Sequence, residues 1–391
     1  MRVHHVITRL IVGGAQENTL STVLGLLVRP NMEVRLLSGP THGSEGSLEG
    51  LLDPYPGCLI RIPSLVRPVR PIRELRAIGQ LTSLFRRERP DIVHTHSGKA
   101  GILGRVAARR ARVSIVIHGI HGPSFGHFQG PLPNLLFKNA ERWAGKMTDH
   151  FVVVADAMRQ QYLAAGIGHP EQYTRVYSGF DLRPFLEARR DEGKANSLGL
   201  KPEHFVVGTI ARLFALKGHD DLIDAAPELV RRIPNIRFLW IGDGPWRQRL
   251  LNRIRASGLQ DHFILAGLVP PSEVPSWIGL MDCLAHLSRR EGLPRALPQA
   301  MAAGKPVVAF DCDGAGEACR SGETGFLIAP GDQKGLIDAL TTLARDTAMG
   351  RHLGENGREW VRDRFTAERL VSDQYDLYRR LTAQRLGQND G

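Results

Sequence analysis

The segment HFVVGTIARLFALKGHDDLIDAAPELVRRIPNIRFLWIG (204–242) has an apolar run at each end and a helical pattern between them. Its central apolar residues recur at helical spacing: Leu222, Ile223, Ala226 and Leu229. Short apolar strands that alternate with amphipathic helices are typical of βαβ units, and therefore of parallel sheets. The segment predicts an α/β fold.

The same alternation extends in both directions along the chain. From residue 204 onward, strands are predicted at 204–212, 236–242, 262–267, 282–288, 306–312 and 325–329. Before it, strands are predicted at 3–8, 32–38, 91–96, 113–119 and 150–155. We therefore expect two Rossmann-like domains, each a doubly wound parallel sheet, that face a cleft where ligands bind.

A polar stretch with scattered glycine and proline, 178–204, separates the two series of strands. We place an N-terminal domain at 1–185 and a C-terminal domain at 186–365. The segment 366–386 has the pattern of a long amphipathic helix. We expect this helix to cross back and belong to the N-terminal domain.

The charge is unevenly distributed along the chain. Of 51 Lys+Arg and 40 Asp+Glu in 391 residues, 23 basic and 13 acidic residues lie in 1–185. Much of this excess lies in Arg61–Arg76, which could face anionic lipid, a phosphorylated substrate or nucleic acid, or be solvated surface. These arginines have almost no aromatic neighbours, which argues against single-stranded nucleic acid, and we expect no nucleic-acid partner.

The chain has no apolar run of 18 residues, and its start, MRVHHVITRL, alternates where a signal peptide would be continuously apolar. We therefore expect a cytoplasmic protein. The arginines of 61–76 predict peripheral contact with the inner face of an anionic membrane.

Candidate ligand-binding residues follow the predicted strands. Gly13-Gly14 lies between the first strand and the first helix, where the backbone can approach an anion. It is not a G-x-G-x-x-G fingerprint, which argues against a nicotinamide or flavin enzyme. Arg212 and Lys217 flank the loop after a later strand and suit a diphosphate, although both could be exposed surface cations.

Another candidate site is the loop that contains Glu291 and Gly292, before a predicted helix that contains Gln299. A carboxylate beside accessible backbone N–H groups could bind a ligand with several hydroxyls. A single glutamate on a loop is more often simply solvated. The neighbouring motifs favour the functional interpretation.

In this order along the chain, the motifs resemble those of the family-4 retaining glycosyltransferases of the GT-B architecture. The resemblance runs from Gly13 to about Ala329. It rests on the glycine pair, DIVHTHSGKAG (91–101), His118-Gly119, SGFDLRPF (178–185), the segment 208–218, Gly242-Asp243-Gly244-Pro245 and the Glu291 segment.

The resemblance implies a role for each matching residue. Arg212 and Lys217 would neutralise the nucleotide diphosphate, so that no metal or other cofactor is required. Glu291 would bind donor-sugar hydroxyls, and His118 would lie near the donor sugar and the acceptor. The other implied donor-side residues are Gly13, Gly14, Gly242, Asp243, Gly267, Leu268, Val269, Gly292, Leu293 and Gln299. On the acceptor side we expect His96, Lys99 and Phe125, the last on a mobile loop.

Two positions depart from the family pattern. Gln299 stands where most members have a second glutamate that binds the ribose hydroxyls, which would lower nucleotide affinity by about 1 kcal/mol. Pro294 stands at a position often held by glycine. We expect both changes to affect the identity and affinity of the donor more than the fold.

A metal site is a possible interpretation of His94, His96, His118, His121 and His127, because the first two share one face of a strand. No carboxylate at ligand spacing accompanies them, and packed histidines are the favoured interpretation. No metal is expected.

The sequence thus predicts a metal-independent, retaining glycosyltransferase. It would move a sugar from a nucleoside diphosphate donor, expected to be UDP-linked, to a glycan or lipid-linked acceptor in cell-surface polysaccharide or glycolipid synthesis. One alternative is a UDP-sugar 2-epimerase of the same architecture. The other is a non-catalytic module that binds anionic polymers.

Overall fold

The computed structural model describes residues 1–41, 46–126 and 128–387. The chain forms two compact units. Unit 1 contains residues 1–180 and the returning segment from Thr366, and unit 2 contains Asp181–Phe365. Unit 2 thus begins at Asp181 rather than at residue 186. The C-terminal helix, α15 (Ala367–Gly387), belongs to unit 1, where the Ala367 N–H donates to the Phe180 carbonyl oxygen at 3.1 Å.

Unit 1 is built on a parallel sheet of seven strands among the described residues, in the order β3-β2-β1-β4-β5-β6-β7. The order reverses between β1 and β4, which pair in parallel with His5 opposite His94. The strands are β1 (Arg2–Ile7), β2 (Glu33–Ser38), β3 (Leu59–Arg61), β4 (Ile92–His96), β5 (Ile115–Ile120), β6 (His150–Val153) and β7 (Tyr173–Arg175).

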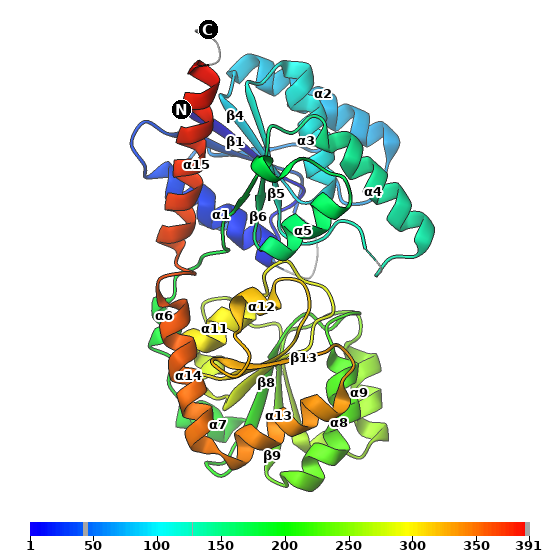
Figure 1. Cartoon of the computed structure of the whole chain (residues 1–391), viewed down its shortest axis with the longest axis vertical. Coiled ribbons are helices and arrows are strands. Elements are labelled where there is room, and N and C mark those ends of the chain that lie inside the picture. The colour runs from blue at the N-terminus through cyan, green and yellow to red at the C-terminus, as the bar shows by residue number, and fades with distance from the viewer. Residues whose placement is uncertain (42–45, 127, 388–391) are drawn as a thin grey trace. The chain divides into compact units, whose positions relative to one another are not determined.

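Helices cover both faces of this sheet. Figure 1 shows α1 (Gly14–Leu27) and α15 on one side and α2 (Pro71–Glu88), α3 (Gly98–Ala111) and α4 (Pro131–Gly145) on the other. The alternation of side chains along each strand supplies two cores. In β1, Val3 and Ile7 pack with α1 and α15, whereas Val6 packs with α2 and α3. The short helix α5 (Asp156–Ala164) follows β6.

Unit 2 is built on a parallel sheet of six strands among the described residues, in the order β10-β9-β8-β11-β12-β13. This is the Rossmann order, with its switch point between β8 and β11. The strands are β8 (Phe205–Ile210), β9 (Ile236–Ile241), β10 (Phe263–Gly267), β11 (Cys283–His286), β12 (Val307–Phe310) and β13 (Gly325–Ile328). The helices are α6 (Arg183–Leu186), α7 (Glu192–Ser197), α8 (His219–Arg232), α9 (Arg247–Ala256), α10 (Val274–Gly279), α11 (Ala296–Ala302), α12 (Ala315–Ala318), α13 (Gln333–Arg345) and α14 (Thr347–Arg362).

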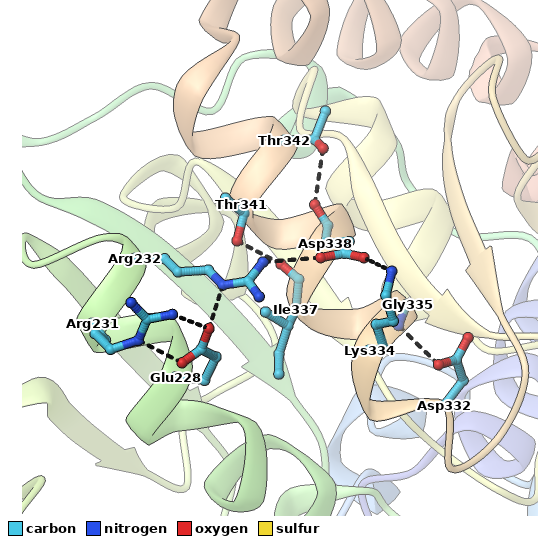
Figure 2. A network of polar contacts seen from close by, with 10 residues as sticks. All are labelled: Glu228, Arg231, Arg232, Asp332, Lys334, Gly335, Ile337, Asp338, Thr341 and Thr342. Atoms are coloured by element: carbon cyan, nitrogen blue, oxygen red, sulfur yellow. Dashed lines mark hydrogen bonds and ion pairs between the residues drawn. The ribbon is translucent and has the colours of Figure 1, made fainter.

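The helical pattern in 219–232 is explained by the core of unit 2. The four predicted apolar residues of α8 are all buried, together with apolar residues of α9 and α13. At the surface, Arg232 of α8 pairs with Glu228 of the same helix at 2.5 Å and connects α8 to α13 through Asp338 at 2.9 Å (Figure 2). Apolar burial holds these helices together, because exposed pairs of this kind contribute little.

All eleven predicted strands are present, with ends that differ by a few residues. The sequence analysis missed β3 and β7, which are the short edge strands of the first sheet. No helix within the described ranges is both long and apolar enough to cross a lipid bilayer.

Candidate active site

Most of the predicted donor residues lie at the carboxyl ends of strands in unit 2, and the loops of Lys217 and Glu291 follow the two strands of its switch point. The loops after β8 and β11 emerge from adjacent strands and are joined through Leu216, whose carbonyl oxygen accepts from Arg289 N–H (2.8 Å) and Ser288 Oγ (3.1 Å). Switch points are where open α/β sheets bind ligands. The fold therefore places both loops at a binding edge.

Backbone geometry keeps these two loops close together. Gly218 has a φ of +73°, and a Cβ there would lie 2.1 Å from the Leu287 carbonyl oxygen. Only glycine allows this approach. Leu216 also has a positive φ, +66°, which is an unfavourable conformation for a leucine. The loop after β8 thus has two left-handed residues, one of which is a strained leucine.

Lys217 and Glu291 form the centre of the site. Lys217 Nζ lies 2.5 Å from Glu291 Oε1, and His286 Nε2 lies 3.2 Å from the same oxygen. The backbone N–H of Glu291 donates to Asp313 Oδ2 at 2.7 Å. Burial alone would raise the pKa of Glu291, but Lys217 and His286 outweigh it and hold that pKa well below its usual range. Glu291 is therefore an ionised carboxylate that can accept hydrogen bonds from hydroxyl groups.

Asp313 is a functional candidate that the sequence analysis missed. It follows β12, the strand next to β11, and it has a positive φ of +50°. Burial raises the pKa of its carboxyl group. His286 and Ser288 were missed as well. The available signal was their position at a strand end, where side chains of neighbouring strands meet.

Arg212 lies on the same loop as Lys217 but is exposed, with its guanidinium 5.2 Å from the centre of the Phe214 ring. Gly292 and Leu293 are buried after Glu291, and the Gly292 carbonyl oxygen accepts from Gly314 N–H at 3.0 Å. Gln299 is half-buried on α11. The donor roles of these residues remain predictions.

The loops after β9 and β10 complete the edge. Gly242 N–H donates to the Gly267 carbonyl oxygen at 2.8 Å, and the Asp243 carbonyl oxygen accepts from Leu213 N–H at 3.1 Å. A Cβ on Gly242, whose φ is +132°, would lie 2.1 Å from the Ala211 carbonyl oxygen. Leu268 is 53% exposed, and Val269 follows it. The structure thus places the predicted donor residues of unit 2 on adjoining loops and strand ends, apart from Gln299 on α11.

In unit 1, Gly13 and Gly14 lie where α1 begins, and Gly14 is exposed. The Gly13 carbonyl oxygen accepts from Glu17 N–H at 2.9 Å, in the first turn of the helix. The neighbouring backbone N–H groups point out of the helix end, where an anion is favoured. The predicted phosphate role of the glycine pair is untested.

The other unit 1 candidates are largely enclosed. His118 is 1% exposed, with Nδ1 3.0 Å from Thr95 Oγ1. Lys99 Nζ is paired with Glu74 at 2.7 Å. Phe125, predicted to face the acceptor, is 4% exposed and packs on Tyr162, with ring centroids 4.9 Å apart. Its ring is thus part of the packing of unit 1, because the loop folds inward.

The histidines of the metal hypothesis do not form one group. His94 and His96 share a face of β4, with ring centroids 4.2 Å apart, but His118 lies on the opposite face against α3. His127 lies outside the described residues. Within those residues, the one set of three that could hold a metal is His5, His94 and His96, which adds a histidine of β1.

Two family models match this chain, one in each half. Residues 12–183 match Glycosyltransferase Family 4, and residues 191–360 match Glycosyl transferases group 1. The EpsD protein of Bacillus subtilis (strain 168), named as a glycosyltransferase, is 30% identical over 337 residues, or 83% of this chain and 85% of EpsD. The UDP-Gal:alpha-D-GlcNAc-diphosphoundecaprenol alpha-1,3-galactosyltransferase of Escherichia coli is 27% identical over 382 residues, or 97% of this chain and 96% of that enzyme.

Solved structures show the same fold. Anabaena HepE in complex with UDP-glucose superposes with a TM-score of 0.80 at 23% identity, over 97% of this chain and 99% of that chain. Sucrose-phosphate synthase from Thermosynechococcus elongatus gives a TM-score of 0.82 at 18% identity, over 98% of this chain and 100% of that chain. The two Rossmann-like units are thus those of the GT-B architecture. The chain belongs to the family-4 glycosyltransferases and is a glycosyltransferase.

Proposed function

We propose that this enzyme transfers a sugar from a UDP-linked donor, with retention of anomeric configuration, to a glycan or lipid-linked acceptor in cell-surface polysaccharide or glycolipid synthesis. The observation that carries the proposal is the contact between Lys217 and Glu291 at the switch point of unit 2. It places a cation and an ionised carboxylate side by side, as a ligand with a diphosphate and several hydroxyls requires.

The hydrogen-bond donors and acceptors of Lys217 and Glu291 give these two residues different roles. The Lys217 ammonium has three N–H donors, of which one is directed to Glu291 Oε1 and another to Ser288 Oγ at 3.4 Å. We assign the third to a phosphate oxygen of the donor. Both contacts of Glu291 with Lys217 and His286 use Oε1, and we assign Oε2 to the hydroxyls of the donor sugar.

Lys217 and Arg212 would also stabilise the negative charge that develops on the departing diphosphate. Lys217 is partly buried and held by Glu291, so it can stabilise such charge without reorganisation, whereas Arg212 is exposed on the same loop. Side chains would then supply the positive charge that a bound metal ion can supply in a catalytic site, and we propose that no metal is needed.

A UDP donor is supported by the Escherichia coli relative, whose name specifies UDP-galactose and an acceptor linked to diphosphoundecaprenol. Relatives named for GDP-mannose also match, at 29% identity. The base is therefore tested by melting the protein with UDP, GDP and ADP. UDP at about 100 times its Kd should add about 2.7 kcal/mol, or about 5–10 °C for a unit of this size. Stabilisation by GDP alone would reject the UDP assignment.

The proposed membrane contact is supported by the first half of α2 and the segment before it. Val69, Ile72 and Leu75 are 65–77% exposed and alternate with exposed arginines, among which are Arg70 and Arg73. Apolar side chains that alternate with cations suit the interface of an anionic bilayer. Arg61 contributes less, because Glu49 pairs with it at 2.5 Å.

Helix α4 supports the same contact, because it buries a charged side chain and exposes apolar side chains, the opposite of an ordinary surface helix. Its buried charged residue, Glu141, pairs with Arg105 of α3 at 2.7 Å, with both side chains at most 1% exposed. Its outer face instead exposes apolar side chains, which are Leu132, Leu135, Leu136, Phe137 and Trp143, at 40–76%. We assign these side chains to the hydrocarbon side of the interface.

Sedimentation with vesicles tests the membrane contact. We expect the protein to pellet with phosphatidylglycerol vesicles more than with phosphatidylcholine vesicles, and the double variant Leu132→Ser/Leu136→Ser to stay in the supernatant. Met349→Ser is the control, because Met349 is an exposed apolar residue of unit 2. Unchanged pelleting of the double variant would reject this surface.

A further inference from the structure

A small cavity lies inside unit 1, on the face of the sheet covered by α1 and α15. It offers about 10 Å³ to the centre of a water molecule, about what one water needs. Its lining includes Asn18 of α1, His94 of β4 and Gln374 of α15, which are at most 4% exposed. Asn18 Oδ1, His94 Nε2 and Gln374 Nε2 are buried atoms without a hydrogen-bond partner among the described residues.

A continuous series of hydrogen bonds starts and ends at this cavity. Asn18 Nδ2 lies 3.3 Å from His121 Nδ1, and His121 Nε2 lies 2.9 Å from His96 Nδ1. His96 Nε2 lies 2.9 Å from His5 Nδ1. At the other end, Tyr378 of α15 connects two histidines: its hydroxyl lies 3.4 Å from His5 Nε2 and 2.6 Å from His94 Nδ1.

The direction of this series fixes the protons. The amide N–H of Asn18 donates to His121, so the remaining proton of neutral His121 is on Nε2 and is donated to His96. The same reasoning makes His96 donate to His5. It then makes His5 donate to the Tyr378 oxygen, and the Tyr378 hydroxyl donate to His94 Nδ1. His94 is left with an Nε2–H that points into the cavity.

We propose that one buried water molecule occupies this cavity and closes the series into a ring. The water would accept from His94 Nε2–H and Gln374 Nε2–H and donate to Asn18 Oδ1, which satisfies all three atoms. Buried waters usually make about three such bonds. A metal ion does not suit these groups, because two of the three present N–H protons.

The ring requires neutral imidazoles, and their environment provides them. Burial lowers the pKa of His5 to about 3 and that of His121 to about 4, and it holds the pKa of His94 and His96 well below the usual value. In this ring all four histidines carry their proton on Nε2. This shared tautomer is a consequence of the ring that packing alone does not impose.

The ring connects elements that are far apart in the sequence. Its members come from α1, β1, β4, the segment after β5, and α15, the helix by which the chain returns to unit 1. We therefore assign to the ring the role of fixing α15 and α1 on the sheet. This role does not depend on the sugar or acceptor of the enzyme.

Two measurements on the full chain at pH 7 test the proposal. A high-resolution crystal structure should show one water within hydrogen-bond distance of Asn18, His94 and Gln374. Nitrogen-15 NMR of the imidazoles should show the Nε2–H tautomer for His5, His94, His96 and His121. A dry cavity, an Nδ1–H or mixed tautomer, or one equivalent of bound metal by elemental analysis would overturn the proposal.

Variants test the role of the ring. Tyr378→Phe removes one hydroxyl from the ring, and we expect amide hydrogen exchange in α15 and α1 to become at least tenfold faster, with α2 and α3 unchanged. Tyr375→Phe, on the same helix but outside the ring, is the control and should leave exchange unchanged. In Gly119→Ala, the new methyl would lie 2.9 Å from His96 Nδ1 and 3.0 Å from His94 Nε2, so it should displace the water. Equal exchange in Tyr378→Phe and Tyr375→Phe would refute the role.

Discussion

Lowering the pH from 7 to 5.5 should destabilise unit 1 much more than unit 2. Burial lowers the pKa of four histidines of unit 1 well below 6.5: to about 4 for His4, about 3 for His5, and about 4 for His121 and His150. In unit 2, His219 is the one described histidine with a comparable value, about 4.

The sign and size of this destabilisation follow from the linkage between proton binding and unfolding. An unfolded histidine, with a pKa near 6.5, binds a proton at pH 5.5, whereas these folded histidines stay neutral. The free energy of unfolding therefore holds its full value above pH 6.5 and falls as the pH drops toward the folded pKa. Between pH 7 and 5.5 each such histidine lowers the free energy of unfolding by about 1.2 kcal/mol, so the four together lower it by about 5 kcal/mol. For a unit of this size, that lowers the Tm by about 10–20 °C.

Hydrogen exchange with mass spectrometry at the two pH values, corrected for the intrinsic exchange rate, would follow each unit separately. Loss of protection should concentrate in unit 1. In His150→Gln, where glutamine can still reach Thr174, the free energy of unfolding lost between pH 7 and 5.5 should be about 1.2 kcal/mol smaller. His352→Gln, at an exposed histidine of α14, should not change it. Equal loss of protection in both units would refute the reasoning.

Three further perturbations have definite expected outcomes. Gly218→Ala should destabilise unit 2 by about 2 kcal/mol or more in calorimetry, because its methyl would meet the Leu287 carbonyl oxygen at a positive φ; wild-type stability would contradict this. Glu141→Gln should cost about 3–5 kcal/mol in denaturant unfolding, because it leaves Arg105 buried without its counter-charge; a loss below 1 kcal/mol would show that water reaches the arginine. Sugar transfer should continue in EDTA, since Lys217 and Arg212 neutralise the diphosphate in the proposal; activity restored only by a divalent ion would reject metal independence.

The sequence was sufficient wherever a local pattern determined the structure. The alternation in 204–242 predicted β8, α8 and β9, because each element is long enough to show its period. Strands β3 and β7 have three residues each, too few for a period, and they form only as edges of a sheet that is already built. The sequence also predicted that Lys217 and Glu291 lie on loops, because both follow strands with a clear apolar pattern.

The sequence could not predict the contacts that depend on the order of strands in the sheet. His5 looks like any residue of an apolar strand, and only the parallel pairing of β1 with β4 brings it beside His94. Asp313 reaches Glu291 because β12 lies next to β11. Phe125 lies on a Gly/Pro-rich loop that suggests exposure, but the contact of its ring with Tyr162 buries it. Such contacts depend on tertiary packing.

The most direct test of the central claim is isothermal titration of UDP into the wild type and into Lys217→Met. Lys334→Met is the matched control, because Lys334 is also a lysine of unit 2 paired with a carboxylate, Asp338, at 2.5 Å. A lost charge-assisted bond to phosphate is worth about 1.5–3 kcal/mol, so Lys217→Met should weaken binding about 10- to 150-fold. Lys334→Met should bind like the wild type. Equal affinity in Lys217→Met and the wild type would contradict the assignment of the donor site to Lys217 and Glu291.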